Sequence, residues 1–221
     1  MLVRALASNQ NNYSFSNYYI FKLSLILYSL LVMRILWKIY LWITGWKVRN
    51  NFPYHLKKCI VIVAPHTSAW DFVMGLAIRS VLRLTHVKYL GKAELFQGKF
   101  GFFFRKMGGY PVDRFNNKNM VDQVAELFEQ HDEFVLALSP EGTRKRVDRL
   151  RTGFYHIAKK ANVPIVMAAM DFSKKEVWFS EAFLATDNEE ADFKKIIDFY
   201  APVQGKIPEQ GLAHLKESSF A

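Results

Sequence analysis

The stretch from Val61 to Asp71 constrains the fold of this 221-residue chain more than any other. It starts as a run of β-branched residues, which predicts a buried strand, and the run stops at Pro65. Helical spacing of apolar side chains then follows at Trp70, Val73, Met74, Ala77 and Val81. A strand that passes through a polar turn into a helix is the building unit of open α/β sheets, which place functional groups at such turns. The stretch therefore predicts an α/β fold with a functional site at this turn.

The alternation of strand and helix patterns continues to about residue 200. Apolar runs predict strands over 59–63, 86–90, 134–138, 163–170 and 176–180, and helical periods predict helices over 93–107, 120–128, 155–161 and 193–200. Asn116 and Asn117 are candidate caps for the helix from residue 120, and Asp187 with Glu190 is a candidate capping box for the last helix. Because helices separate the strands, we expect a mixed, largely parallel sheet flanked by helices.

The first fifty residues differ in composition from the rest of the chain. Residues 1–19 are rich in Asn, Ser and Tyr without a hydrophobic period, which predicts a disordered tail. Residues 20–50 are apolar and aromatic but interrupted by Lys22, Arg34 and Lys38, and no uninterrupted run reaches the ~20 residues that span a bilayer. We expect a membrane-associated helical segment that either spans the bilayer or lies in its interface. A helix of a soluble core and a signal peptide are the alternatives.

The remaining boundaries follow from where the strand and helix patterns stop. An α/β domain is expected over residues 51–205, and residues 206–221 carry little pattern and are expected to form a C-terminal tail. Met33 is a second candidate for the start of translation, because it opens a shorter apolar and aromatic segment.

The net charge of +10 predicts a negatively charged partner, which can be a membrane surface, a nucleic acid or an acidic substrate or carrier. The sequence has neither an aromatic RNA-binding motif nor zinc-finger spacing, so nucleic acid is not the expected partner. The single cysteine, Cys59, excludes an internal disulfide framework and a multi-cysteine metal site. Because Cys59 lies in an apolar run, we expect a buried structural thiol.

His66 and Asp71 are the candidate catalytic pair. The unperturbed pKa of histidine, near ~6.5, suits a general base at neutral pH, and a carboxylate can orient the ring and stabilise its protonated form. Residues five apart on one helix are rotated by roughly 140° and do not meet. The pair therefore requires His66 in the turn and Asp71 on the first helical turn, with Thr67 or Ser68 as the cap. Alternatively, His66 is a polar loop residue and Asp71 only favours the helix dipole.

Two other strand ends carry polar groups that can converge on the same crevice. One is Asp113 with Arg114, and the other is the turn from Glu141 to Arg144. The planar guanidinium of arginine binds two oxygens of a phosphate at once. The sequence has no G-x-S-x-G, P-loop or H-E-x-x-H motif, so a base that deprotonates a substrate hydroxyl directly is the simplest chemistry.

Four blocks in this order resemble the glycerolipid acyltransferase superfamily, of the lysophosphatidic acid acyltransferase type. The H-x4-D motif matches His66 and Asp71, and the following blocks match Gly109 to Arg114, Pro140 to Arg144 and Val163 to Val166. The resemblance covers about residues 58–170 and implies a fold like that of glycerol-3-phosphate acyltransferase. It also implies membrane association, with the active site on the cytoplasmic face of the inner or plasma membrane.

The resemblance implies transfer of a fatty acyl group from acyl-CoA or acyl carrier protein to the hydroxyl of a lysophospholipid-type acceptor. His66 would take the hydroxyl proton and Asp71 would orient His66. The acceptor phosphate would be bound by the remaining motif residues, which are Arg114, Glu141, Gly142, Thr143 and Arg144. No metal or bound cofactor is implied, since the acyl donor is a co-substrate.

The chain also departs from the family pattern, at Pro65, Pro111, Ser139 and Lys145. These departures predict a divergent subgroup whose acceptor can differ from lysophosphatidate. A transacylase, an acyltransferase for a lyso-lipid without phosphate, and an inactive membrane lipid-binding scaffold are the alternative functions.

Overall fold

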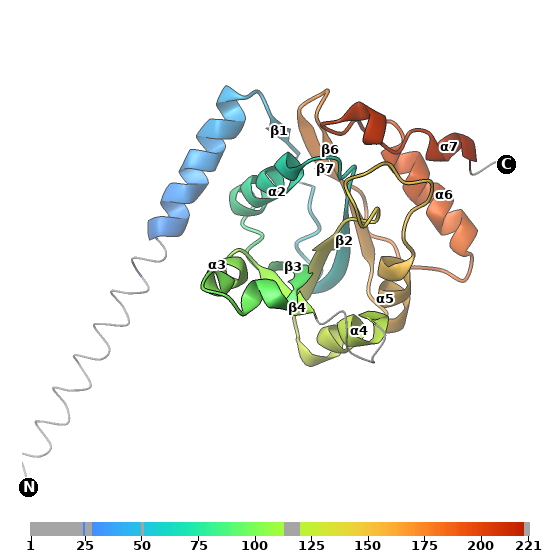
Figure 1. Ribbon diagram of the computed structural model, residues 1–221, viewed down its shortest axis with the longest axis horizontal. Coiled ribbons are helices and arrows are strands. Elements are labelled where there is room, and N and C mark those ends of the chain that lie inside the picture. The colour runs from blue at the N-terminus through green and yellow to red at the C-terminus, as the bar shows by residue number, and fades with distance from the viewer. Residues whose placement is uncertain (1–23, 25–27, 50, 113–119, 219–221) are drawn as a thin grey trace, which may run out of the picture.

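The computed structural model describes residue 24 and residues 28–49, 51–112 and 120–218. A sheet of seven strands forms its centre, in the order β1-β7-β6-β2-β5-β3-β4 (Figure 1). The strands are β1 (Lys47–Val48), β2 (Lys58–Ala64), β3 (Val87–Lys92), β4 (Gly109–Val112), β5 (Phe134–Leu138), β6 (Ile165–Asp171) and β7 (Glu176–Phe179). All neighbours pair in parallel except β6 and β7, which are antiparallel. The predicted mixed, largely parallel sheet is confirmed.

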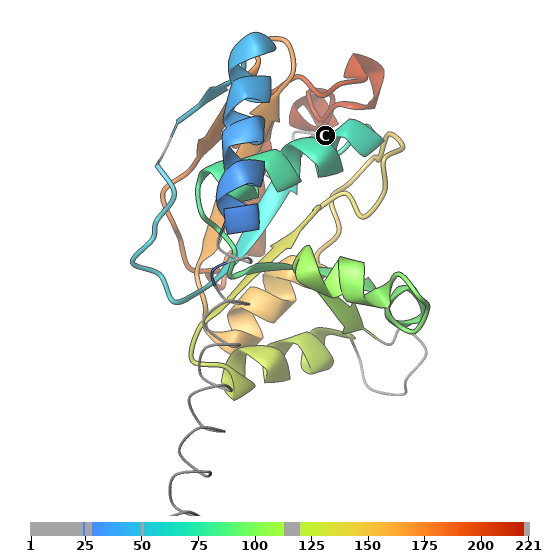
Figure 2. The same ribbon diagram turned by 90° about the vertical axis from the view of Figure 1, so that its left-hand side faces the viewer.

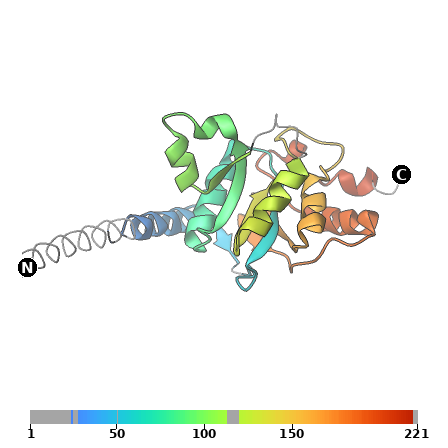
Figure 3. The same ribbon diagram turned by 90° about the horizontal axis from the view of Figure 1, so that it is seen from below.

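Helices cover both faces of the sheet (Figures 1 and 2). The longer ones are a helix over residues 28–43, α2 (Ala69–Val81), α4 (Met120–Gln130), α5 (Gly153–Ala161) and α6 (Glu189–Tyr200). The short ones are η1 (Ala93–Phe96), α3 (Gly101–Lys106), η2 (Pro208–Gln210) and α7 (Leu215–Ser218). The helix over 28–43 lies at one end of the molecule and α7 at the other (Figure 3).

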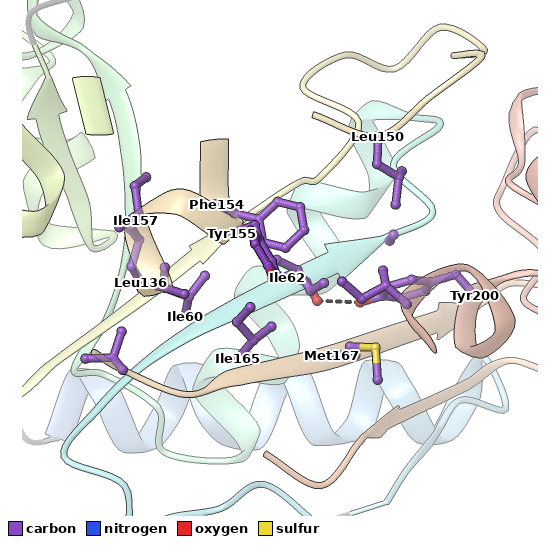
Figure 4. Close-up of a cluster of buried hydrophobic side chains, with 14 of the residues drawn as sticks. Ile60, Ile62, Leu136, Leu150, Phe154, Tyr155, Ile157, Ile165, Met167 and Tyr200 are labelled. Atoms are coloured by element: carbon purple, nitrogen blue, oxygen red, sulfur yellow. Dashed lines mark hydrogen bonds between the residues drawn. The ribbon is translucent and has the colours of Figure 1, made fainter. Parts of the chain in front are cut away.

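The central strand β2 shows why the sheet has two cores. Its side chains alternate between the faces, because successive residues of a strand point in opposite directions. Ile60 and Ile62 join the core formed with α4, α5 and α6, where the hydroxyl of buried Tyr200 donates to the carbonyl of Ile62 at 2.6 Å (Figure 4). Cys59 and Val61 join the core formed with α2 and the helix over 28–43. Burial raises the pKa of the Cys59 thiol to about 12, as expected for a structural cysteine.

Several predicted elements differ in detail. Residues 93–107 form η1 and α3 rather than one helix, and the backbone at Gly101 lies so close to the carbonyl of Phe96 that a Cβ would be 2.2 Å from its oxygen. The predicted capping box of the last helix is wrong: Asn188 is the cap and accepts from the backbone of Ala191, while Asp187 pairs with Lys159. The candidate caps Asn116 and Asn117 lie outside the described residues.

The C-terminal segment also differs from its prediction. Residues 206–218 do not extend away as a tail, because Leu212 and Leu215 are buried in the core that contains β2, α5 and α6. The proline and glycine residues of this segment limit it to two short helical turns, so it shows no helical period in the sequence.

The helix over 28–43 exposes most of its apolar side chains, which include Tyr28, Leu31, Met33, Ile35, Leu36, Ile39, Trp42 and Ile43. Leu41 is buried against the domain. Among the helices of the described residues, none combines the length and the hydropathy needed to cross a bilayer. Membrane association of residues 20–50 stays a prediction, and the predicted tail over 1–19 lies outside the described residues.

Candidate active site

His66 and Asp71 face each other at the carboxyl end of β2. The ring Nδ1 of His66 lies 3.2 Å from the Asp71 carboxylate oxygen Oδ2. Helix α2 starts immediately after Ser68, which is its N-cap, and Asp71 is its third residue. The predicted placement, with the histidine in the turn and the aspartate on the first helical turn, is therefore present in the structure.

Backbone groups fix the orientation of the Asp71 carboxylate. Its Oδ2 accepts hydrogen bonds from the backbone N–H of Thr67 and of Ser68, each at 2.7 Å. The Asp71 side chain is only 4% exposed, whereas that of His66 is 31% exposed. The carboxylate is thus held inside the turn, and the imidazole that it contacts reaches the surface.

Glu141 joins the third motif block to the His66 turn. Its Oε1 accepts from the backbone N–H of His66 and its Oε2 accepts from the hydroxyl of Ser139, both at 2.8 Å. The side chain is buried, and this burial raises the pKa of its carboxyl, although the two hydrogen bonds oppose the shift. Ser139 is one of the departures from the family pattern, and here its hydroxyl donates to the carboxylate that holds the His66 turn.

The sheet register explains why these two turns meet. Strands β2 and β5 are parallel neighbours with Ile62 opposite Leu138, so the segments that follow them leave the same edge of the sheet. The substrate-binding role of Glu141 stays a prediction, and the contacts of its carboxylate are with the His66 turn and Ser139.

The rest of the Glu141 turn lies at the surface. Gly142 is exposed and has a φ of +68°, a left-handed conformation that favours glycine. The hydroxyl of Thr143 accepts from the backbone of Lys145 at 3.3 Å, and the Arg144 side chain is exposed. These three predicted substrate-binding residues therefore border the turn that holds His66. Asp113 and Arg114 lie outside the described residues.

The C-terminal segment contacts both turns, which no sequence pattern indicates. The backbone N–H of Ile207 donates to the hydroxyl of Thr67 at 3.1 Å. The side-chain amide of Gln210 lies against the carbonyls of Thr67 and Arg144, and with its nitrogen turned toward them it donates to both, to that of Thr67 at 3.0 Å. Pro202, Gly205, Pro208 and Gly211 mark the segment as irregular, which is the only sequence signal that it carries. Gln210 thus links the His66 turn to the Glu141 turn.

Gly205 allows this close approach, because a Cβ there would lie 2.6 Å from Cγ2 and 2.7 Å from Oγ1 of Thr67. We expect Gly205→Ala to lower the free energy of unfolding by about 1–3 kcal/mol through overpacking. Gly75→Ala is the matched control, since nothing lies within 4 Å of its Cβ position in α2, and it should raise stability by about 0.5–1 kcal/mol. Urea unfolding of both variants checks the pair, and equal effects would contradict the packing of Gly205 on Thr67.

A cavity of about 240 Å³ lies beside the start of α2. It is mostly apolar and is lined by Tyr40, Thr44, Trp46, Trp70, Met74, Phe172, Lys175 and Lys206. Trp70 directly precedes Asp71, and Lys206 lies between Gly205 and Ile207, which both contact Thr67. An apolar cavity with two lysines thus lies beside the first turn of α2, the turn that also carries Asp71.

Comparison with known proteins places the chain in a family. It belongs to the Acyltransferase family, whose model matches residues 46–171, which is more than half of its length. This match confirms the resemblance carried by the four sequence blocks.

The chain is also similar to one relative of known activity and to one solved structure. It is 29% identical over 131 residues to 1-acyl-sn-glycerol-3-phosphate acyltransferase of Streptococcus pneumoniae (strain ATCC BAA-255 / R6), a match that covers 55% of this chain. The chain spans about half of that relative, 47% of its length. The fold is similar to the crystal structure of the 1-acyl-sn-glycerophosphate (LPA) acyltransferase PlsC of Thermotoga maritima. The TM-score is 0.50 at 15% identity, and the match covers 85% of this chain and 79% of that structure.

Proposed function

We propose that this protein transfers a fatty acyl group from a thioester donor to the hydroxyl of a lysophospholipid. The contact between Nδ1 of His66 and Oδ2 of Asp71, in a chain of the Acyltransferase family, is the observation that carries the proposal. A buried carboxylate on Nδ1 holds the proton there, so the lone pair of Nε2 is free to accept a proton from a substrate.

In the proposed reaction, Nε2 of His66 removes the proton of the acceptor hydroxyl as its oxygen attacks the thioester carbonyl carbon. A carbon–oxygen bond forms and the carbon–sulfur bond then breaks. The leaving thiolate takes the proton from the imidazolium, which returns His66 to its neutral form. Asp71 stabilises the imidazolium between the two proton transfers. Acyl-CoA or acyl carrier protein supplies the thioester, and no step requires a metal or a bound cofactor.

The remaining motif residues hold the acceptor in this scheme. Arg114 and Arg144 pair with the phosphate, and the exposed turn at Gly142 and Thr143 lets the headgroup approach the backbone. Glu141 contributes indirectly, because its carboxylate accepts from the backbone N–H of His66 and so fixes the turn that carries the base. The aromatic cavity beside Trp70 offers an apolar environment for part of an acyl chain.

We also propose that the protein works on a membrane, in phospholipid biosynthesis or remodelling. The helix over 28–43 exposes a continuous set of apolar and aromatic side chains, which favours insertion into a bilayer interface. The active site would then face the cytoplasmic side of the inner or plasma membrane, where soluble acyl thioesters reach it.

The test is acylation of a panel of lyso-lipids by purified protein, with labelled acyl-CoA and then acyl carrier protein as donor and mass spectrometry of the products. We expect acylation of an acceptor that carries a phosphate. Acylation of monoacylglycerol alone would point to an acceptor without phosphate, and the absence of product with every donor and acceptor would contradict acyl transfer.

The role of Arg114 gives a sharper prediction. Arg114→Ala should raise the KM for a phosphate acceptor by about 10–100-fold, because it removes one charge-assisted hydrogen bond. The KM for the donor should stay unchanged. Arg49→Ala is the control, because Arg49 pairs with Glu176 on the surface. An equal rise in both KM values would show that Arg114 does not hold the acceptor phosphate.

A further inference from the structure

Three phenylalanines of the segment 99–106 point into solvent, and we call these three side chains the aromatic knob. Phe100 is 75% exposed, Phe102 76% and Phe103 55%. Soluble surfaces seldom group large apolar side chains in this way, and such groups mark binding surfaces.

The aromatic knob has a base of packed side chains, so its exposure does not result from an unfolded segment. Phe96 is buried and stacks edge-on against Phe104 at 6.2 Å. Arg105 lies over the Phe96 ring at 5.3 Å and donates to its carbonyl at 3.3 Å. The phenylalanines of this region are thus divided between a base that holds α3 and three rings that face outward.

Cations border the outward-facing rings. Lys99, Arg105 and Lys106 are exposed, and the segment 99–106 contains no acidic residue. Aromatic side chains bordered by lysine and arginine are typical of surfaces that enter the headgroup region of anionic bilayers. A protein partner would have to supply both an apolar pocket and an acidic rim.

The position of the knob agrees with a bilayer as its occupant. In Figure 2, α3 and the loop between β5 and α5 project on the right-hand side, where β2 passes into α2. That loop carries further exposed cations, which are Arg144, Lys145, Arg146, Arg149 and Arg151. A basic surface and an aromatic knob therefore lie on the side of the molecule to which the His66 turn belongs.

We propose that the aromatic knob inserts into the headgroup region of an anionic phospholipid bilayer, as a contact separate from the helix over 28–43. It anchors the side of the domain that carries the His66 turn to the membrane from which a lipid acceptor comes. This contact goes beyond acyl transfer and is tested by membrane binding alone. A negative result would therefore not contradict the proposed reaction.

A cysteine added at the surface can be labelled selectively, because the protein's own cysteine, Cys59, is fully buried. This makes a direct test available. Full-length Phe102→Cys is labelled with an environment-sensitive fluorophore and mixed with vesicles of phosphatidylcholine, with or without a quarter phosphatidylglycerol. Leu184→Cys is the matched control, since Leu184 is 55% exposed in the connection between β7 and α6. We expect a blue shift at position 102 that is larger with phosphatidylglycerol, and no shift at position 184.

Three results would overturn the proposal. One is no shift at position 102, and another is an equal shift at both positions. The third is a shift that grows with protein concentration without vesicles, which would make a second copy of the chain the occupant.

A second measurement is vesicle co-sedimentation of the triple variant Phe100→Ser, Phe102→Ser and Phe103→Ser. Its partition coefficient should fall by about tenfold or more, while Leu184→Ser is unchanged, and thermal unfolding confirms that both variants are folded.

Discussion

Asp71→Asn is expected to lower kcat by about 10²–10⁴-fold while the protein stays folded. An asparagine at this position is isosteric and its carbonyl can still accept from the backbone of Thr67 and Ser68, so the cap of α2 persists. It cannot stabilise a protonated His66, because its amide carries no charge. Steady-state kinetics with a saturating donor measures the effect.

The control for Asp71→Asn is Ser68→Ala, which removes the capping hydroxyl of α2 but leaves the carboxylate. It should cost about 1 kcal/mol of stability and little activity. If both variants lost activity in proportion to stability, Asp71 would be a capping residue only, and the orienting role would be contradicted.

Glu141→Ala is the second large effect that we expect. The substitution removes the acceptor of the His66 backbone N–H and of the Ser139 hydroxyl, which should lower the free energy of unfolding by about 1–3 kcal/mol. It also frees the turn that carries His66, and a displacement of about 1 Å in such a turn costs about 10²-fold in rate. Denaturant unfolding and kinetics on the same preparation separate the two effects.

Glu141→Gln provides the matched comparison and a prediction for pH. Burial raises the pKa of the Glu141 carboxyl, so its contribution to stability is complete below the pKa of an unfolded glutamate and is lost as pH rises through the higher folded value. A glutamine stays neutral, so the variant should gain stability relative to wild type as pH rises through this window. Unfolding curves at a series of pH values test this, and a relative loss with rising pH would contradict a raised pKa.

The β2 turn and the architecture were predictable because they depend on local patterns. The β-branched run from Val61, the stop at Pro65 and the spacing from Trp70 all act within a few residues, and so does the capping by Ser68. These patterns predicted the strand, the helix and the meeting of His66 with Asp71. Parallel pairing then placed the Glu141 turn beside them.

The contacts that close the site were not predictable, because they join residues distant in sequence. Gln210 and Ile207 contact Thr67 across about 140 residues, and no period marks the segment that carries them. The contact of Glu141 with the backbone of His66 depends on register as well as on composition. The division of the phenylalanines between the base and the knob accompanies the break between η1 and α3, where Gly101 lies close to the carbonyl of Phe96, and sequence spacing does not encode this break.

The rate at which wild type and His66→Ala form diacyl product from lysophosphatidate and acyl-CoA tests the central claim most directly. If His66 is the general base, wild type forms the product and the variant is slower by about 10²–10⁴-fold with an unchanged unfolding curve. The pair is repeated with acyl carrier protein as donor. Equal rates for the two proteins would contradict the assignment of His66 as the base, and no product from wild type with either donor would contradict acyl transfer to this acceptor.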